Sequence, residues 1–190
     1  LTIIDRGAAA WRVTARYPDA GDIHNLLEEP DGTLWLSTYV NGFWRIPAAA
    51  AIDDWTAVRP EHYHRSAGLP GEYTWATVYP APGGTAFCTS AGARRFDPAT
   101  RRFEPETRFV VNGRAGLLCV PMALTTGSEA WSSVFADSLI SAAHPFGRFR
   151  PGPGGTLRWF GAPHAAQQQI GFAGTAVIQV ESTPAGETVW

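Results

Sequence analysis

The sequence predicts an all-β fold, namely a β-propeller arc of about four four-stranded antiparallel blades, with the first and last blades incomplete. Two observations predict it. A turn-and-strand pattern recurs roughly every 50 residues, which is the period of one blade. The composition is also rich in glycine, proline and tryptophan, with 20, 15 and 8 residues among 190. Such a composition is typical of short strands that are joined by tight turns and packed by large rings.

The clearest repeat spans residues 23–46 and reads IHNLLEEPDGTLWLSTYVNGFWRI. An extended run leads into an Asp-Gly turn, a second strand carries a tryptophan, and a further glycine turn opens a third strand. Asp-Gly between β-prone runs is a strong hairpin signal because glycine accepts the positive φ of the turn. The segment therefore predicts a three-stranded meander. Its defining positions are Asp31, Gly32, Trp35, Thr38 and Gly42.

Three weaker copies follow the first repeat. The second copy spans residues 73–96, is two residues shorter in its second turn, and carries Gly84, Phe87 and Gly92. The third surrounds Trp131, and the fourth begins at residue 176, turns at Gly186 and reaches Trp190. We expect outermost strands at 55–59, 102–111 and 156–160. The blades are predicted at about 12–60, 67–111, 115–161 and, truncated, 168–190 of a single propeller segment.

The phrase EPDGTLWLST, followed by NGF and then by AGLP ahead of the second copy, is similar to the two-component regulator propeller repeat. The resemblance covers residues 12–105 well and the remainder weakly. Phe43 departs from the family's usual Leu, and Phe87 departs from its Trp. The matching positions are Glu29, Asp31, Gly32, Thr33, Trp35, Thr38, Gly42, Gly68, Leu69, Pro70, Gly84, Thr85 and Gly92.

The resemblance implies a noncatalytic ligand-sensing segment of a bacterial two-component-type receptor, with a periplasmic or extracellular location. Members of the family often take a carbohydrate or another small ligand. The resemblance also implies that the partners of this segment are the remaining blades of the same chain. The membrane helix and the kinase or other output module of such a receptor would lie outside residues 1–190.

Two other functions stay open at this point. One is a propeller lyase of the virginiamycin B lyase type, in which a His and a Glu near the channel mouth act as acid and base with a metal. The other is a protein-interaction propeller with neither ligand nor chemistry. Thr38 at the end of the tryptophan strand and the Gly-Leu-Pro lead-in favour the sensor over the lyase.

Composition narrows the chemistry further. The formal net charge of −2 and the pI near 6.2 argue against nucleic acid as a partner. All 15 basic residues are arginine, which excludes lysine nucleophiles and a P-loop lysine. We expect no cofactor.

We also expect no metal. The nearest metal signal is His62-Tyr63-His64, whose alternate side chains share one face, and we expect it to be a solvated connection. Cys88 and Cys119 lie in no ligand spacing, and we expect two buried free thiols.

Ligand contacts in a propeller are expected where the innermost strands begin, because the loops of all blades converge there. On this basis the candidate ligand-binding residues are His24 and Asn25 at one inner strand and Tyr73 and Trp75 at the next. Aromatic faces with nearby amides suit a sugar ring. A packing role for Trp75 between blades is the competing interpretation.

The blade count predicts how residues 1–190 behave when they are expressed alone. Propellers usually close with about 4 to 8 blades, so an arc of about three complete blades should expose unpaired sheet edges. We expect this segment to self-associate and to be cleaved readily in limited proteolysis. A protease-resistant monomer with a cooperative thermal melt would contradict the prediction.

Overall fold

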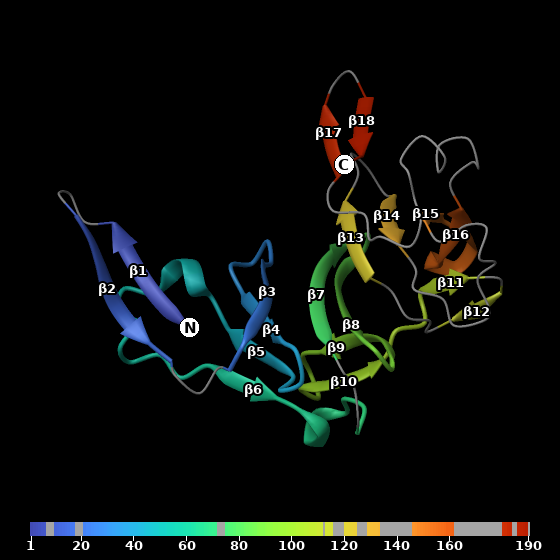
Figure 1. Cartoon of the computed structure of the whole chain (residues 1–190). Helices are drawn as coiled ribbons and strands as arrows, with labels where there is room; N and C mark the ends of the chain where they lie inside the picture. Colours follow the sequence, from blue (N-terminus) through green and yellow to red (C-terminus); the bar gives the residue numbers. More distant parts are fainter. Residues whose placement is uncertain are drawn as a thin grey trace. The chain divides into compact units, whose positions relative to one another are not determined.

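The structure is a computed structural model of the whole chain, shown in Figure 1. It describes residues 1–6, 10–17, 21–71, 75–111, 113–115, 120–124, 129–133, 146–161, 180–183 and 186–189. The chain divides into two compact units, Leu1–Val78 and Tyr79–Trp190. Strands and short 3-10 turns account for the regular structure of the described residues, so the predicted all-β fold is confirmed.

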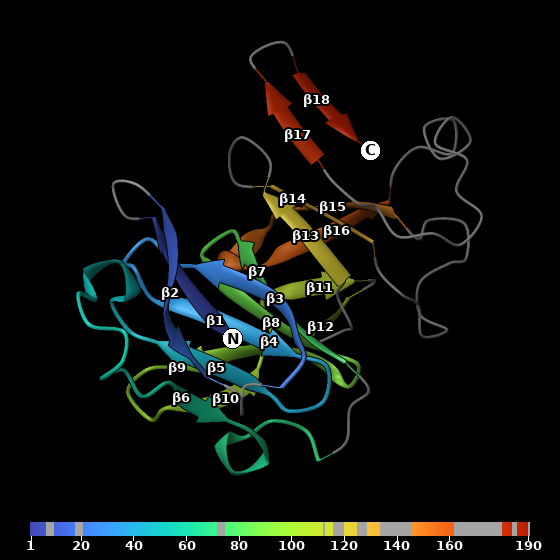
Figure 2. The ribbon, with the colours of Figure 1, turned by 60° about the vertical axis from the view of Figure 1, so that its left-hand side comes forward.

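The first unit contains a hairpin and a four-stranded sheet. Strands β1 (Thr2–Arg6) and β2 (Trp11–Arg16) form a two-stranded antiparallel sheet. The four-stranded sheet is an antiparallel meander in the order β3-β4-β5-β6, with its strands side by side in Figure 2. Two 3-10 turns, η2 (Ala49–Ala51) and η3 (Arg65–Ala67), flank its last strand. The strands are β3 (Ile23–Glu28), β4 (Leu34–Thr38), β5 (Phe43–Ile46) and β6 (Glu61–Tyr63).

The next sheet is a second four-stranded meander, ordered β10-β9-β8-β7. Its first strand begins in the last residues of the first unit, and the other three belong to the second unit. The two four-stranded meanders have the strand order of propeller blades, as the repeat predicts. The strands are β7 (Ala76–Ala81), β8 (Gly84–Thr89), β9 (Gly92–Asp97) and β10 (Arg102–Pro105).

The second unit continues with a six-stranded sheet and a final hairpin. Within the larger sheet, β13-β14-β15-β16 form a third antiparallel meander, and β11 adds to its edge by pairing parallel to β16. The turn η4 (Pro153–Gly155) precedes β16. The strands are β11 (Phe109–Val111), β12 (Arg114–Ala115), β13 (Val120–Leu124), β14 (Ala130–Ser133), β15 (Phe146–Pro151), β16 (Leu157–Gly161), β17 (Val180–Thr183) and β18 (Gly186–Val189).

The predicted aromatic anchors occupy corresponding strands. Trp35 and Phe87 are each about 1% exposed on the second strand of their meander, and Trp131 lies on the second strand of the third. Trp190 lies outside the described residues. Each of the three faces an arginine across the ladder to the third strand. The pairs are Trp35 with Arg45, Phe87 with Arg94 and Trp131 with Arg148.

A threonine closes the turn after each of the first two anchor strands. Thr38 Oγ1 donates a hydrogen bond to the Gly42 carbonyl at 3.0 Å, and Thr89 Oγ1 donates to the Gly92 carbonyl at 2.9 Å. Each hydroxyl also accepts a backbone N–H of its own turn. Both threonines are buried, so each bond contributes on the order of 1 kcal/mol and leaves no polar atom unpaired. Thr38 therefore shapes the turn.

The two-residue shortening of the second repeat is divided between strand and turn. Two residues separate Trp35 from Thr38, whereas one separates Phe87 from Thr89. The turn from Thr38 to Gly42 is likewise one residue longer than its counterpart. The third strand is shortened as well, because two residues separate Gly42 from Arg45 and one separates Gly92 from Arg94. The deletion in the anchor strand is thus matched by one in the third strand, and the anchor still pairs with an arginine in both sheets.

Two predicted outer strands differ from the structure. The first sheet closes with Glu61–Tyr63 instead of residues 55–59, because the Asp54 carboxylate accepts the Thr56 N–H and folds that segment into turns. Residues 102–111 divide at the buried Glu106 into β10 and β11, which belong to different sheets. The prediction of a strand at 156–160 is confirmed by β16.

The expectation of free thiols is wrong. Cys88 is completely buried and disulfide-bonded. The chain contains one other cysteine, Cys119, which lies outside the described residues. Cysteine spacing alone does not predict a disulfide, because the bond depends on how closely two Cα and Cβ atoms approach in the folded chain.

A matched pair of glycine substitutions tests the close approach at the β4–β5 turn. Gly42 and Gly113 have nearly the same φ angle, +77° and +78°. A Cβ on Gly42 would overlap the Tyr63 carbonyl oxygen, whereas nothing lies within 4 Å of one on Gly113. Gly113→Ala should cost about 1–2 kcal/mol from the backbone alone, and Gly42→Ala about 1–3 kcal/mol more from overpacking. Equal losses in urea unfolding would contradict this.

Candidate functional site

The four candidate ligand-binding residues are placed as follows. His24 is exposed on β3, and its ring lies 4.4 Å from that of Tyr39. The Asn25 amide donates to the Thr77 hydroxyl at 3.3 Å and to the Val78 carbonyl at 2.9 Å. Trp75 is half-buried just before β7, and Tyr73 lies outside the described residues. Asn25 therefore ties β3 to the start of β7, and the ligand-binding role of all four residues stays a prediction.

One end of the first sheet gathers several polar and aromatic side chains. The register pairs Ile23 with Thr38 and Phe43 with Tyr63, so the start of β3, the β4–β5 turn and the end of β6 meet there. We call this end the rim. Its turn exposes two apolar residues, Tyr39 at 49% and Val40 at 68%. The rim is the end of the sheet at which β3, the first strand, begins, and it is where the sequence analysis predicts ligand contacts.

A pocket of about 500 Å³ opens at the rim. We call it the histidine pocket. Its described lining comes from the β4–β5 turn, from β6 and from the segment after β6. This lining contains two imidazole rings and one guanidinium group, and no carboxylate. The lining residues are Val40, Asn41, His62, His64, Arg65 and Gly71.

His62 is held firmly in this pocket. Its ring stacks flat on Trp44, with centroids 4.0 Å apart and an interplanar angle of 5°. Its Nε2 lies 2.6 Å from the Asn41 carbonyl oxygen, so this nitrogen carries the hydrogen that it donates. The centroid of the His64 ring lies 5.1 Å from that of the His62 ring. Among the described residues, no group of three or more His, Cys, Asp or Glu gathers at metal-binding distance.

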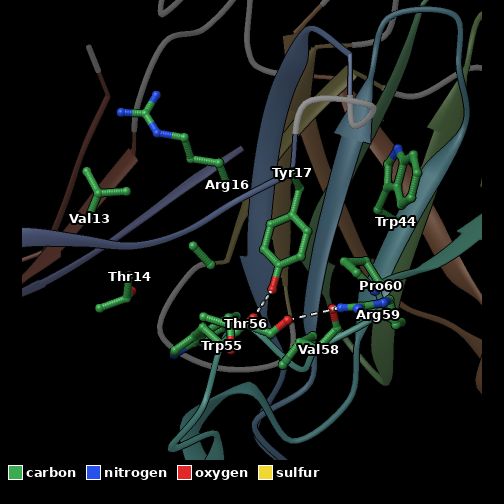
Figure 3. Close-up of a pocket in the computed structure, with 11 residues that line it drawn as sticks. Val13, Thr14, Arg16, Tyr17, Trp44, Trp55, Thr56, Val58, Arg59 and Pro60 are labelled. Atoms are coloured by element: carbon green, nitrogen blue, oxygen red, sulfur yellow. Dashed lines mark hydrogen bonds between the residues drawn. The ribbon is translucent and has the colours of Figure 1, made fainter.

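A second pocket, of about 660 Å³, lies between β2, β5 and the segment before β6 in the first unit (Figure 3). Tyr17, Trp44 and Trp55 give it aromatic walls, so we call it the aromatic pocket. The Tyr17 hydroxyl donates to the Trp55 carbonyl at 2.6 Å. The Arg59 guanidinium donates to the Thr56 and Val58 carbonyls. These polar groups thus bond to the pocket's own backbone.

Sequence reasoning missed both pockets. The aromatic pocket joins residues about 40 positions apart, and its only sequence signal was a pair of large aromatics, Tyr17 and Trp55, outside the repeat pattern. The histidine pocket contains the His62-Tyr63-His64 motif, which was expected to be a solvated connection. His64 is exposed as expected, whereas His62 is partly covered by Trp44.

Local contacts shift two pKa values beside the aromatic pocket. Burial raises the pKa of Tyr17, and the nearby Asp54 carboxylate adds to that effect while Arg59 opposes it. The pKa of Asp54 is lowered because it accepts hydrogen bonds from the Thr56 hydroxyl and the Thr56 backbone N–H. Tyr17 therefore keeps its proton, and its bond to Trp55, above the pH at which an unfolded tyrosine ionises.

Comparison with known proteins identifies the fold. No family model and no curated protein matches the chain. A solved structure does match, that of the extracellular domain of a "putative one component system" from B. thetaiotaomicron. The two share 16% identity with a TM-score of 0.53, over 93% of this chain and 23% of the other. The chain thus spans about a quarter of that domain. In the described part of the chain, no helix is long and apolar enough to cross a membrane.

The Tyr17 hydroxyl provides a test of the aromatic pocket's wall. Tyr17→Phe should lower the free energy of unfolding at pH 7 by about 0.5–1.5 kcal/mol, which is the usual net contribution of one hydrogen bond to stability. Because the folded pKa is raised, wild type loses stability as the pH rises above about 10, where the unfolded tyrosine ionises first. The difference in the free energy of unfolding between wild type and Tyr17→Phe should therefore become smaller from pH 9 to pH 11 in denaturant titrations. A difference that does not change with pH would contradict the raised pKa of Tyr17.

Proposed function

We propose that this chain is a noncatalytic, ligand-sensing propeller segment of an extracytoplasmic bacterial receptor of the two-component type. The observation that carries the proposal is the match of 93% of the chain to an extracellular domain of a one-component system. The Asp-Gly, Trp and Thr positions of the first repeat give further support, because in the first four-stranded sheet Asp31 accepts the Thr33 N–H of the turn, Trp35 is buried and Thr38 closes the next turn.

The buried disulfide at Cys88 supports an extracytoplasmic location. Disulfides persist in secreted and periplasmic proteins and are rare in the reducing cytosol. A periplasmic or extracellular compartment therefore agrees with both the covalent chemistry and the compartment of the structural neighbour.

We propose a carbohydrate or another small molecule as the ligand, bound at the rim. His24 is exposed there beside Tyr39, and Trp75 stands half-buried at the start of the next inner strand. Aromatic faces stack on the C–H surface of a sugar ring, while imidazole and amide groups take its hydroxyls. In the aromatic pocket, by contrast, the Tyr17 hydroxyl and the Arg59 guanidinium are already bonded to backbone carbonyls. The rim is therefore the better place for a polar ligand.

A binding screen on the full-length receptor tests the proposal. We expect one member of a panel of mono- and oligosaccharides to raise the melting temperature of the sensor region and to change the receptor's output. Trp75→Ala should then weaken binding about 10-fold, which corresponds to about 1.4 kcal/mol. Calorimetric titration measures the dissociation constants.

Phe160→Ala is the matched control, since Phe160 is a 46% exposed aromatic residue on β16 of the second unit. It should leave the affinity unchanged. Turnover of a saccharide, or a stable complex with a protein in place of any small ligand, would overturn the proposal in favour of a lyase or a scaffold.

A further inference from the structure

We propose that the histidine pocket at the rim binds a small oxyanion, namely the carboxylate or sulfate group of an acidic ligand. Arg65 supplies the positive charge, His62 and His64 supply further hydrogen-bonding groups, and Asn41 lines the same opening. The inference rests on the proposed function and deepens it, because it names the chemical class of the ligand that the rim takes. If no saccharide binds the protein, the proposed function fails, whereas equal binding of charged and uncharged saccharides overturns only this inference.

The arginine of this pocket is not neutralised by a neighbouring acid. Several arginines elsewhere in the described structure pair with glutamates: Arg45 with Glu61 at 3.1 Å, Arg95 with Glu104 at 2.7 Å and Arg108 with Glu106 at 2.6 Å. Arg65 is exposed and has no carboxylate partner among the described residues. Its guanidinium is thus left to face the opening, in a chain whose formal net charge is −2.

The acid nearest in sequence is directed away from the pocket. Glu61 precedes His62 on β6, so the two side chains lie on opposite faces of the sheet. On its own face Glu61 accepts hydrogen bonds from Arg45 at 3.1 Å and from the Tyr63 hydroxyl at 2.7 Å. The negative charge of Glu61 is therefore already paired with Arg45, and it does not cancel the positive charge of Arg65 in the pocket.

Arg65 is the group in this pocket that meets an oxyanion directly, because its planar fork of N–H donors matches a carboxylate or a sulfate. Trp44 fixes the ring plane of His62, since the two rings stack flat with their centroids 4.0 Å apart. His62 Nε2 donates to the Asn41 carbonyl, so Nδ1 of the neutral ring is an acceptor that suits a hydroxyl group of the ligand. The His64 ring lies beside it, with the two ring centroids 5.1 Å apart.

The size of the pocket sets the size of the ligand. A volume of about 500 Å³ lies within the range of small-molecule sites, which is about 300–1,000 Å³. The exposed Tyr39 and Val40 at its edge offer apolar contact to the uncharged part of the ligand. A molecule of monosaccharide size that carries one carboxylate or sulfate would therefore fill the site.

Calorimetric titration of the full-length protein with three matched probes tests the inference. Glucuronate carries a carboxylate, glucose 6-sulfate carries a sulfate, and glucose is the uncharged reference. We expect at least one acidic probe to bind 10-fold or more tightly than glucose, and the two acidic arms distinguish carboxylate from sulfate. Equal affinities for all three probes would overturn the proposal.

Two arginine variants distinguish an effect of the pocket's own charge from an effect of the protein's net charge. Arg65→Gln should weaken the preferred acidic probe about 10-fold and leave glucose unchanged, because a charged hydrogen bond is lost. Arg102→Gln removes the same charge from an exposed position on β10 and should change nothing. Equal losses in both variants would overturn the proposal, and circular dichroism verifies that both remain folded.

Discussion

A buried ring on the second strand determines where the other strands of each four-stranded sheet lie. Trp35 packs its ring 5.8 Å from Tyr63 on the fourth strand, and Arg45 on the third strand covers it at 5.7 Å. Its Nε1 donates to Glu29 at 3.0 Å, which fixes the turn before the strand. Phe87 likewise packs 5.0 Å from a fourth-strand ring. Removing such a ring would loosen three strands and a turn together.

Exchanging tryptophan for phenylalanine changes how the neighbouring turn is held. The Phe87 side chain has no N–H that could replace the indole N–H of Trp35, so the β7–β8 turn is held by another residue. Arg108 donates to the Pro82 and Gly83 carbonyls at 3.1 and 2.6 Å, and Glu106, which is 0% exposed, neutralises it. A fully buried acid needs such pairing. The same pair ends β10 and directs the chain into β11, which explains why the predicted outer strand divides at this point.

The sequence was sufficient for features that depend on neighbours along the chain, and insufficient for those that depend on distant segments. The Asp-Gly turn and the Trp35 strand follow from local conformational preference and ring size. The first sheet's outer strand was misplaced because Trp55 has high β-propensity, whereas the Asp54 turn that excludes a strand is a side-chain contact. His24 and Asn25 lie near the start of β3, the first strand of its sheet, whereas the contact from Asn25 to Val78 spans 53 positions and could not be read from the sequence.

The repeat thus builds the frame, and positions that the repeat does not specify supply the chemistry. Trp44 shows this most clearly. The ladder fixes its backbone between Leu36 and His62. Its ring then serves two pockets, because it stacks on His62 of the histidine pocket and also lines the aromatic pocket. The turns and the buried anchors set the register of such a strand, so a residue like Trp44 can be replaced in evolution without changing that register. Propellers with the same frame can therefore present different ligand-binding surfaces, since few of these side chains are needed to hold the blade together.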